Sequence, residues 1–368
     1  MQYKKHLRSL MTLLFTCFYS IGGIAEIDAS DNQKLAAAIE EAWDYIQVKP
    51  KFSLSLLSQH SPALEQASEY DKFLYYRVGF WASAYLYDTE KTAYFATAMA
   101  QTKPFPEREQ HLSELLYSLS TWYRRSQQYA QSIDVGRCAI SQAKTAPALM
   151  RVAISTGNAL MLRGNYKEAE PVFNIGLKIS EEHRLRISNS VIRNSLAVMH
   201  LLDNNSNKAK PHLLAALKTN EALARVNGTA INLINLMLVF YHQQDWNSFE
   251  RILNRANRAS KSLASEDINH YFFWLKTVYE IQTQPPMTPY QTTELIDRHS
   301  KIREPSILLL LRPLVNDLKL NIIANSNAAQ ANIIDFKSLF PMCQNDELTD
   351  LTLIELLLAK KETLETKH

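Results

Sequence analysis

The sequence predicts an all-α protein. Glycine is scarce, with 8 residues in 368, while the helix-favouring residues Ala, Leu, Gln, Glu and Lys are abundant. Apolar and polar residues nowhere alternate over a sustained stretch, as they would in a half-buried strand. No two apolar runs are joined by the turn residues that a hairpin needs. With 46% hydrophobic residues, the chain can bury a large core or build a long stacked array.

Residues 1–25 are predicted to be a secretory signal peptide. A basic head, an apolar run over 10–18 and small residues at Gly23 and Ala25 follow in the order that such peptides share, so we expect cleavage after Ala25. A retained membrane anchor is one alternative, although a spanning helix needs about 20 apolar residues. A lipoprotein site at Cys17 is another. Export would place the mature chain in the periplasm or outside the cell.

Loss of this segment changes the charge balance. The chain has 40 Lys and Arg against 37 Asp and Glu, a net charge of +3. The segment carries three basic and no acidic residues, which leaves 37 of each sign. A neutral mature chain lacks the basic excess that drives nucleic-acid binding, so no nucleic-acid partner is expected.

Residues 26–109 are predicted to form degenerate N-terminal helical repeats. Asp31 is expected to cap a first helix that ends before Pro50. A long aromatic helix follows, and an alanine-rich helix over 89–101 is its expected partner. The aromatic side chains are expected in the core, whereas several exposed together would indicate an interface.

Residues 110–265 are predicted to form a regular array of helix pairs. Its second helices carry equivalent positions at Ser132, Ala169, Ala209 and Phe249, which are 37, 40 and 40 residues apart. A fixed period near 40 residues is typical of a helical solenoid.

The stretch 157–179 is the clearest copy of this unit. A glycine permits a left-handed turn between two helices, and small or aromatic residues then recur at three- and four-residue steps. The marked positions are Gly164, Tyr166, Ala169, Phe173 and Leu177. In their order they resemble the tetratricopeptide repeat (TPR) superfamily.

The resemblance is good over 115–265 and loose over 31–101. This chain departs from the family in lacking its first-helix Trp and the Pro that closes each repeat, and in placing Phe249 where alanine is usual. A period near 40 is similar to the TPR arrays of bacterial sensors and transcription regulators. The resemblance implies a right-handed α-solenoid of helix hairpins.

Residues 266–368 are predicted to be a C-terminal helical cap over the last apolar face. Pro305 is expected to begin a helix, residues 324–332 to form a loop, and the last helix to start near Asp346. The apolar run over 307–311 is followed by the charged residues Arg312, Asp317 and Lys319, so no stable membrane insertion is expected after signal cleavage. Docking on a membrane or a partner helix is the alternative for this segment.

Two cysteines, Cys138 and Cys343, remain after cleavage. They could pair in an oxidising compartment, or Cys138 could be a free buried thiol that behaves as a small hydrophobe. The sequence leaves the choice open.

No catalytic motif is present: the sequence lacks His-Glu-x-x-His, Gly-x-Ser-x-Gly, Gly-x-x-x-x-Gly-Lys and Cys-x-x-Cys. We therefore expect no enzyme, no cofactor and no metal site. The regular placement of His200 and His242 is interpreted as a consequence of the repeat.

The TPR resemblance implies that first helices line a concave groove. Amide side chains there could pair with the backbone of an extended peptide, and arginines could hold a carboxylate. Candidate partner-binding residues are Arg124, Arg125, Arg151, Asn158, Asn194, Asn235 and Tyr241. The alternative is that they are solvated or bridge adjacent repeats.

These observations predict an exported scaffold that binds a protein or peptide partner in its concave groove without a cofactor. A sensory or regulatory subunit that responds to a small ligand is the alternative function.

Overall fold

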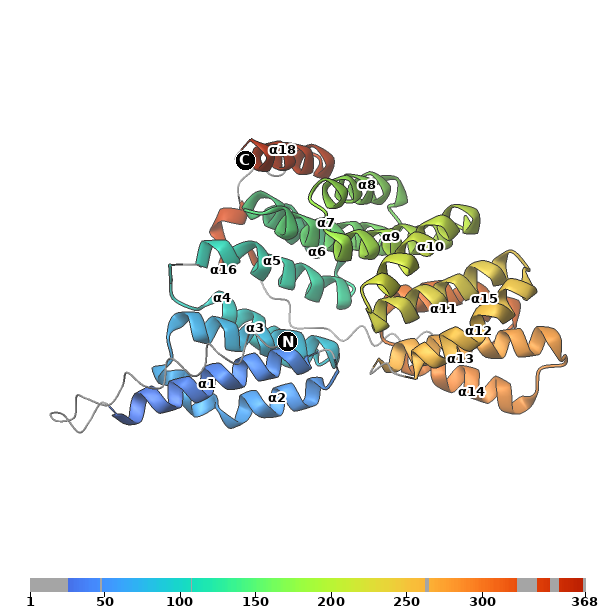
Figure 1. Cartoon of the computed structure of the whole chain (residues 1–368), viewed down its shortest axis with the longest axis horizontal. Coiled ribbons are helices and arrows are strands. Elements are labelled where there is room, and N and C mark those ends of the chain that lie inside the picture. Colours follow the sequence, from blue (N-terminus) through green and yellow to red (C-terminus); the bar gives the residue numbers. More distant parts are fainter. Residues whose placement is uncertain are drawn as a thin grey trace.

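The computed structural model describes residues 26–46, 48–106, 108–261, 265–322, 336–344 and 351–366, and all regular structure within them is helical (Figure 1). The expected signal peptide with its cleavage site, Cys17 and the expected loop over 324–332 lie outside the described residues. None of the described helices has the length and apolar content needed to cross a membrane.

The N-terminal part of the chain forms short helix pairs. Its elements are α1 (Glu26–Tyr45), α2 (Pro50–Gln59), the 3-10 helix η1 (Ser61–Gln66), α3 (Glu69–Tyr85) and α4 (Thr89–Ala100). The expected cap at Asp31 is wrong, because α1 begins at Glu26 and nothing in 26–30 breaks a helix. Asp31 instead pairs with Lys34 inside α1 at 2.9 Å.

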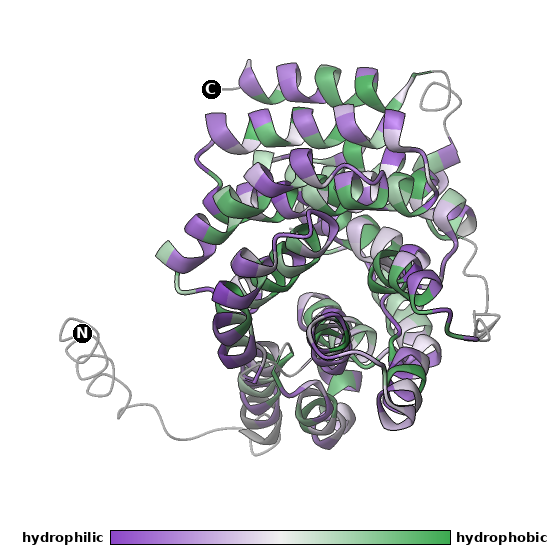
Figure 2. Ribbon diagram, turned by 90° about the vertical axis from the view of Figure 1, so that its right-hand side faces the viewer, coloured by the Kyte–Doolittle hydropathy of each residue, from purple (hydrophilic) through white to green (hydrophobic). Residues whose placement is uncertain are grey.

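The regular array follows as predicted, and each helix packs against the next along the chain. Its elements are α5 (Arg108–Arg125), α6 (Tyr129–Gln142), α7 (Ala146–Leu162), α8 (Tyr166–Glu182), α9 (Arg186–Leu202), α10 (Ser206–Ala222), α11 (Val226–His242) and α12 (Trp246–Ser260). The four equivalent positions Ser132, Ala169, Ala209 and Phe249 are all fully buried, which confirms the predicted register. In a side view (Figure 2) the helices follow a curved path, with hydrophobic residues concentrated where helices face each other.

The α3–α4 loop and the four hairpin loops of the array each turn through one residue in the left-handed region, with φ between 52° and 89°. The residue that follows donates its N–H to a carbonyl five residues back, as from Asn165 to Leu160 at 2.9 Å. This is the Schellman arrangement that satisfies the last carbonyls of a helix. The turning residues are Tyr87, Gln127, Gly164, Asn204 and Gln244.

The C-terminal residues do not stay together at the end of the array. Their elements are α13 (Glu266–Thr283), α14 (Pro289–Lys301), α15 (Pro305–Asp317), α16 (Phe336–Leu339), the 3-10 helix η2 (Pro341–Gln344) and α18 (Leu353–Glu365). The helix α13 continues the array against α11 and α12, α15 lies against α9 and α13, and α18 returns to pack on α6 and α8 (Figure 1). Pro305 begins α15 as expected, whereas α18 begins only at Leu353, after a capping box between Thr352 and Glu355.

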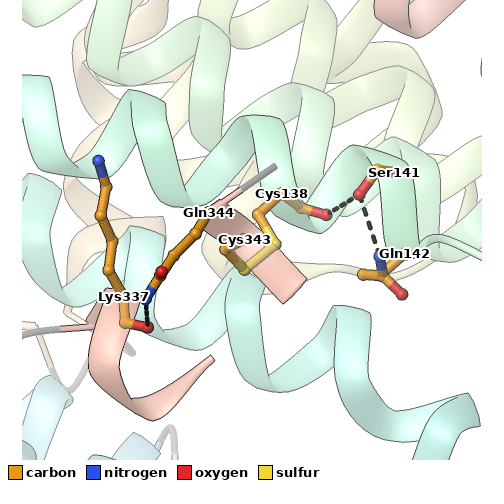
Figure 3. Close-up of a disulfide and its surroundings, with 6 residues drawn as sticks. All are labelled: Cys138, Ser141, Gln142, Lys337, Cys343 and Gln344. Atoms are coloured by element: carbon orange, nitrogen blue, oxygen red, sulfur yellow. Dashed lines mark hydrogen bonds between the residues drawn. A yellow bond between two sulfur atoms is a disulfide. The ribbon is translucent and has the colours of Figure 1, made fainter. Parts of the chain in front are cut away.

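A disulfide joins the returning segment to the array. Cys138 of α6 is bonded to Cys343 of η2, with a Cα–Cα distance of 5.3 Å (Figure 3). On α18, the Lys360 ammonium donates to the Ser141 carbonyl at 2.7 Å, and Lys361 pairs with Glu182 of α8 at 3.1 Å. The two cysteines that the sequence left open are therefore paired.

Candidate functional site

A cleft of about 1600 Å³ lies where the two ends of the curved array approach each other. One wall comes from α2 and the α3–α4 hairpin, a second from α9 and α11, and a third from α13 and α15. Residues far apart in sequence therefore meet at one concave surface, which the tertiary fold alone brings together.

The start of α15 is held to the α3–α4 hairpin and to α5 by a set of mostly half-buried polar side chains. The Glu304 carboxylate lies 3.5 Å from Arg124 Nη1 and accepts the Tyr87 hydroxyl at 3.4 Å. Asp267 accepts the backbone N–H of residue 303 at 3.1 Å and of Glu304 at 2.9 Å. Arg125 stacks over the Tyr87 ring, 5.3 Å from its centroid. We call Tyr87, Arg124, Arg125, Asp267 and Glu304 the closure cluster.

The charges of the closure cluster support each other. Burial pushes the pKa of Glu304 upward, but Arg124 and Arg125 hold it below its usual value, so the carboxylate stays ionised. Burial also raises the pKa of Tyr87, and the nearby Glu304 adds to the effect. The phenol therefore keeps its proton and can donate it to the carboxylate. Burial raises the pKa of Asp267, whose backbone partners act in the opposite direction.

Tyr87 occupies an unfavourable backbone position. Its φ of 54° is in the left-handed region, which a bulky residue rarely adopts. It takes the place that Gly164 has in the best-preserved repeat. The contacts of its side chain with Glu304 and Arg125 account for an aromatic residue at this turn.

The α9–α11 wall of the cleft is a connected set of hydrogen bonds. Asn194 Oδ1 accepts from Asn232 Nδ2 at 2.9 Å and from Asn235 Nδ2 at 3.0 Å. Asn232 in turn accepts from Asn220 at 2.8 Å, and Asn220 accepts from Arg225 Nη1 at 3.0 Å. We call these five residues the amide network. Asn194, Arg225 and Asn235 are its members that line the cleft.

The structure divides the predicted partner-binding residues into three groups. Arg124, Arg125 and Tyr241 contact the protein's own chain: the first two belong to the closure cluster, and the Tyr241 hydroxyl donates to Asp317 of α15 at 3.2 Å. Burial and the neighbouring Asp317 raise the pKa of Tyr241 to about 12. Asn194 and Asn235 line the cleft and also bridge α9 to α11.

The third group, Arg151 and Asn158, lines neither of the cavities found in the described residues. Arg151 is exposed on α7 and Asn158 is half-buried. The helix α15 crosses the C-terminal ends of α9 and α11. A second cavity of about 220 Å³ marks this crossing, between Leu309 of α15 and Leu201 of α9.

Other cleft residues were not predicted from the sequence. Phe52 and Tyr94 are exposed aromatics beside the cleft, 43% and 62% exposed, and Arg225 precedes α11. Tyr271 lines the cleft with a buried hydroxyl that has no hydrogen-bond partner among the described residues. Of these residues, only Phe52 and Tyr94 could have been found from the sequence. Both are large apolar side chains outside the periodic apolar stripe of their helices, which is unusual on a helix face that contacts solvent.

The arrangement offers hydrogen-bonding, apolar and cationic groups for binding. Within the residues described, no group of three or more His, Cys, Asp or Glu is placed to hold a metal ion. The acids of the closure cluster are engaged by arginines and backbone N–H groups.

These features define an α-solenoid of helix hairpins with a cleft between its two ends. No family model matches the chain, and no curated protein matches its sequence. Among solved structures, the fold is similar to the crystal structure of a Rap protein complexed with competence and sporulation factor, with a TM-score of 0.65. That match covers 99% of this chain and 92% of the other at 10% identity, so it shows a shared TPR-like helical-repeat fold.

Proposed function

We propose that this protein is a TPR-type scaffold that binds an extended segment of a protein or peptide partner in its cleft. The volume of the cleft carries this proposal. At about 1600 Å³ it exceeds the roughly 300–1,000 Å³ of small-molecule sites. Its wall presents amide groups, which can pair with a peptide backbone, beside the apolar side chain of Ile231. Such binding needs no catalytic group or cofactor.

The fold similarity supports the same function. The Rap protein of similar fold was crystallised in complex with competence and sporulation factor, so a repeat array of this shape can hold a partner. We further propose that the chain is a divergent, long-period member of the TPR superfamily, on the strength of its 40-residue register and its Schellman turns.

We also propose that the protein works in the periplasm or outside the cell. The Cys138–Cys343 disulfide supports this location, because such bonds persist in oxidising compartments. Mass spectrometry of the chain isolated from its native cells tests the proposal. A mature N-terminus at residue 26 is expected, and a full-length chain with free thiols would contradict it.

Site-specific photo-crosslinking tests the binding site. A benzoylphenylalanine in place of Phe52, which lines the cleft, is expected to form adducts with a partner polypeptide in native cells. The matched control is the same substitution at Tyr290 of α14, which is 73% exposed and does not line the cleft. Adducts at both positions, or at neither, would contradict the proposal. A small molecule that raises the melting temperature without any adduct would favour the regulatory alternative.

A further inference from the structure

The cleft carries an excess of positive charge. Lys and Arg outnumber Asp and Glu among its lining side chains, seven to four. The acids are largely used within the protein: Asp88 caps α4 through the N–H of Lys91 at 3.0 Å, and Asp267 and Glu304 belong to the closure cluster. Three of the cations are engaged as well: Lys91 pairs with Asp88 at 3.2 Å, Lys301 pairs with Asp297 at 2.5 Å, and Arg125 belongs to the closure cluster. Four cations remain against one acid, Glu266, which is exposed in the first turn of α13. The cleft therefore favours an anionic occupant.

Arg225 is the cation of the cleft that most needs a counter-ion. Two other half-buried arginines have a carboxylate partner: Arg77 pairs with Glu114 at 3.3 Å and Arg193 with Glu181 at 2.9 Å. Arg225 is half-buried, yet no carboxylate pairs with it among the described residues. Burial alone lowers its pKa, which is the sign of a charge removed from water without compensation.

The amide network fixes the direction of this guanidinium. Nη1 of Arg225 donates to Asn220 Oδ1 at 3.0 Å and to Ser190 Oγ at 3.3 Å. Its Nε and Nη2 groups have no partner within the described part of the chain. A guanidinium held on one side presents its other N–H groups as a fork, the geometry that binds a carboxylate with two parallel hydrogen bonds.

Neighbouring groups in the cleft complete a binding surface for a peptide. Among described residues, Asn194 Nδ2 and Asn235 Oδ1 are not used in the amide network, so one donor and one acceptor remain on the same wall. Tyr271 also lines the cleft and is only 3% exposed, and its hydroxyl has no hydrogen-bond partner in the described parts of the chain. Unpaired buried polar groups are costly, and a bound segment would satisfy them.

We propose that Arg225 binds a carboxylate of the partner segment, so that the cleft selects an acidic peptide. This inference rests on the proposed function and specifies the chemistry of its ligand. The carboxylate belongs to an Asp or Glu side chain or to the C-terminus of the segment, two sources that binding measurements distinguish.

The test uses the purified full chain and a positional-scanning library of fluorescent nonapeptides. The first comparison places either Glu or Gln at each peptide position in turn. The second compares peptides whose C-terminus is a free carboxylate with peptides whose C-terminus is an amide. We expect the carboxylate to bind about tenfold or more tightly than its amide at one position or at the C-terminus, in line with a charged hydrogen-bonded pair. Arg225→Gln should reduce this preference to less than about twofold.

Two further variants separate the assigned arginine from general effects of charge or folding. Arg163→Gln removes an exposed arginine outside the cleft and should keep the full preference. Arg225→Lys keeps the charge without the fork and should give an intermediate preference, so it also serves if Arg225→Gln does not fold.

Each outcome decides a different point. Equal binding of acidic and amide peptides would overturn the acidic ligand and leave the proposed function standing. A preference that survives in both Arg225 variants would overturn the role of Arg225. No binding of any peptide would overturn the proposed function itself, and this inference with it.

Discussion

The array α5–α12 and the C-terminal elements from α15 to α18 are held in place by different interactions. In the array each helix packs on its neighbours through buried Ala, Leu and aromatic side chains, and the same turn is repeated at a fixed spacing. The C-terminal elements are held by contacts over long sequence separations: 180 residues for Glu304 and Arg124, 205 for the disulfide, and 219 for Lys360 and Ser141.

This difference shows how the protein combines a modular array with a defined cleft. The stability of a solenoid is approximately the sum of contributions from contacts between neighbouring repeats, so a change in one contact affects mainly the adjacent helices. Closure of a long chain segment costs entropy that a few specific bonds must offset. The loss of one such bond should therefore release a whole element, and the following predictions test this contrast from the largest expected effect to the smallest.

Removal of the disulfide should have the largest effect. Cys138→Ala with Cys343→Ala is expected to lower the free energy of unfolding by about 2–5 kcal/mol, because a long loop is no longer closed in the unfolded chain. Amide hydrogen exchange should rise in α18 more than in α10, which α18 does not contact closely. Equal exchange in α18 of both proteins would show that side-chain packing alone holds this helix.

Loss of the Glu304 carboxylate should have the next largest effect. Glu304→Ala leaves Arg124 and Arg125 without their main counter-charge and is expected to cost about 3 kcal/mol, at the low end for a buried pair because the Glu304 side chain is still 20% exposed. Urea unfolding measures the change.

The control for Glu304 is Glu280→Ala, which breaks an exposed pair with Lys276 within α13. Such a pair contributes about 0.3–0.5 kcal/mol. Equal losses in the two variants would show that the closure cluster has no special contribution to stability.

A substitution at a buried helix contact of the array should cost less, because it disturbs only the adjacent helices. Ala209 is fully buried on α10, and Ala209→Phe is expected to overpack its contact with α9 and to cost about 1–3 kcal/mol. Leu214→Phe on the same helix is the matched control, because Leu214 is 48% exposed and should tolerate the larger ring. An unchanged thermal melting curve for Ala209→Phe would contradict the repeat register.

Acidification should give the smallest effect, through histidines of the array and through His270 of α13 and His299 of α14, whose pKa burial also lowers. Burial lowers the pKa of His200, His212 and His242 in the array below 6.5. As pH falls through 6.5 the unfolded chain binds protons that the native array does not, so the free energy of unfolding decreases. Urea unfolding at pH 7.5 and 5.5 should show this loss.

Glu304 responds in a lower pH range. Its native pKa lies below the ordinary 4.5, so its stabilising contribution is complete above that pH and is lost only as pH falls through the native value. Glu304→Ala should therefore cost the same at pH 7.5 and 5.5, whereas His200→Gln with His212→Gln should reduce the pH dependence. A Glu304 effect that disappears by pH 5.5 would contradict this assignment.

Much of the array could be predicted from the sequence. The positions Ser132, Ala169, Ala209 and Phe249 are buried as their spacing predicts, and the glycine turn at Gly164 is repeated by residues that are not glycine. Helix formation, repeat register and turns depend on interactions between residues three to forty positions apart. The periodic pattern of the sequence over these separations is enough to predict them.

The cleft and the roles of its residues were decided only by the tertiary structure. Arg124 and Arg225 have the same chemistry, yet α15 brings Glu304 to the first and no described carboxylate to the second. Likewise, Cys138 is paired because α16, η2 and α18 return to α6 and α8. Such contacts join segments about 200 residues apart. The local sequence pattern does not predict which distant segments come into contact, because many chain paths are compatible with the same helix periodicity.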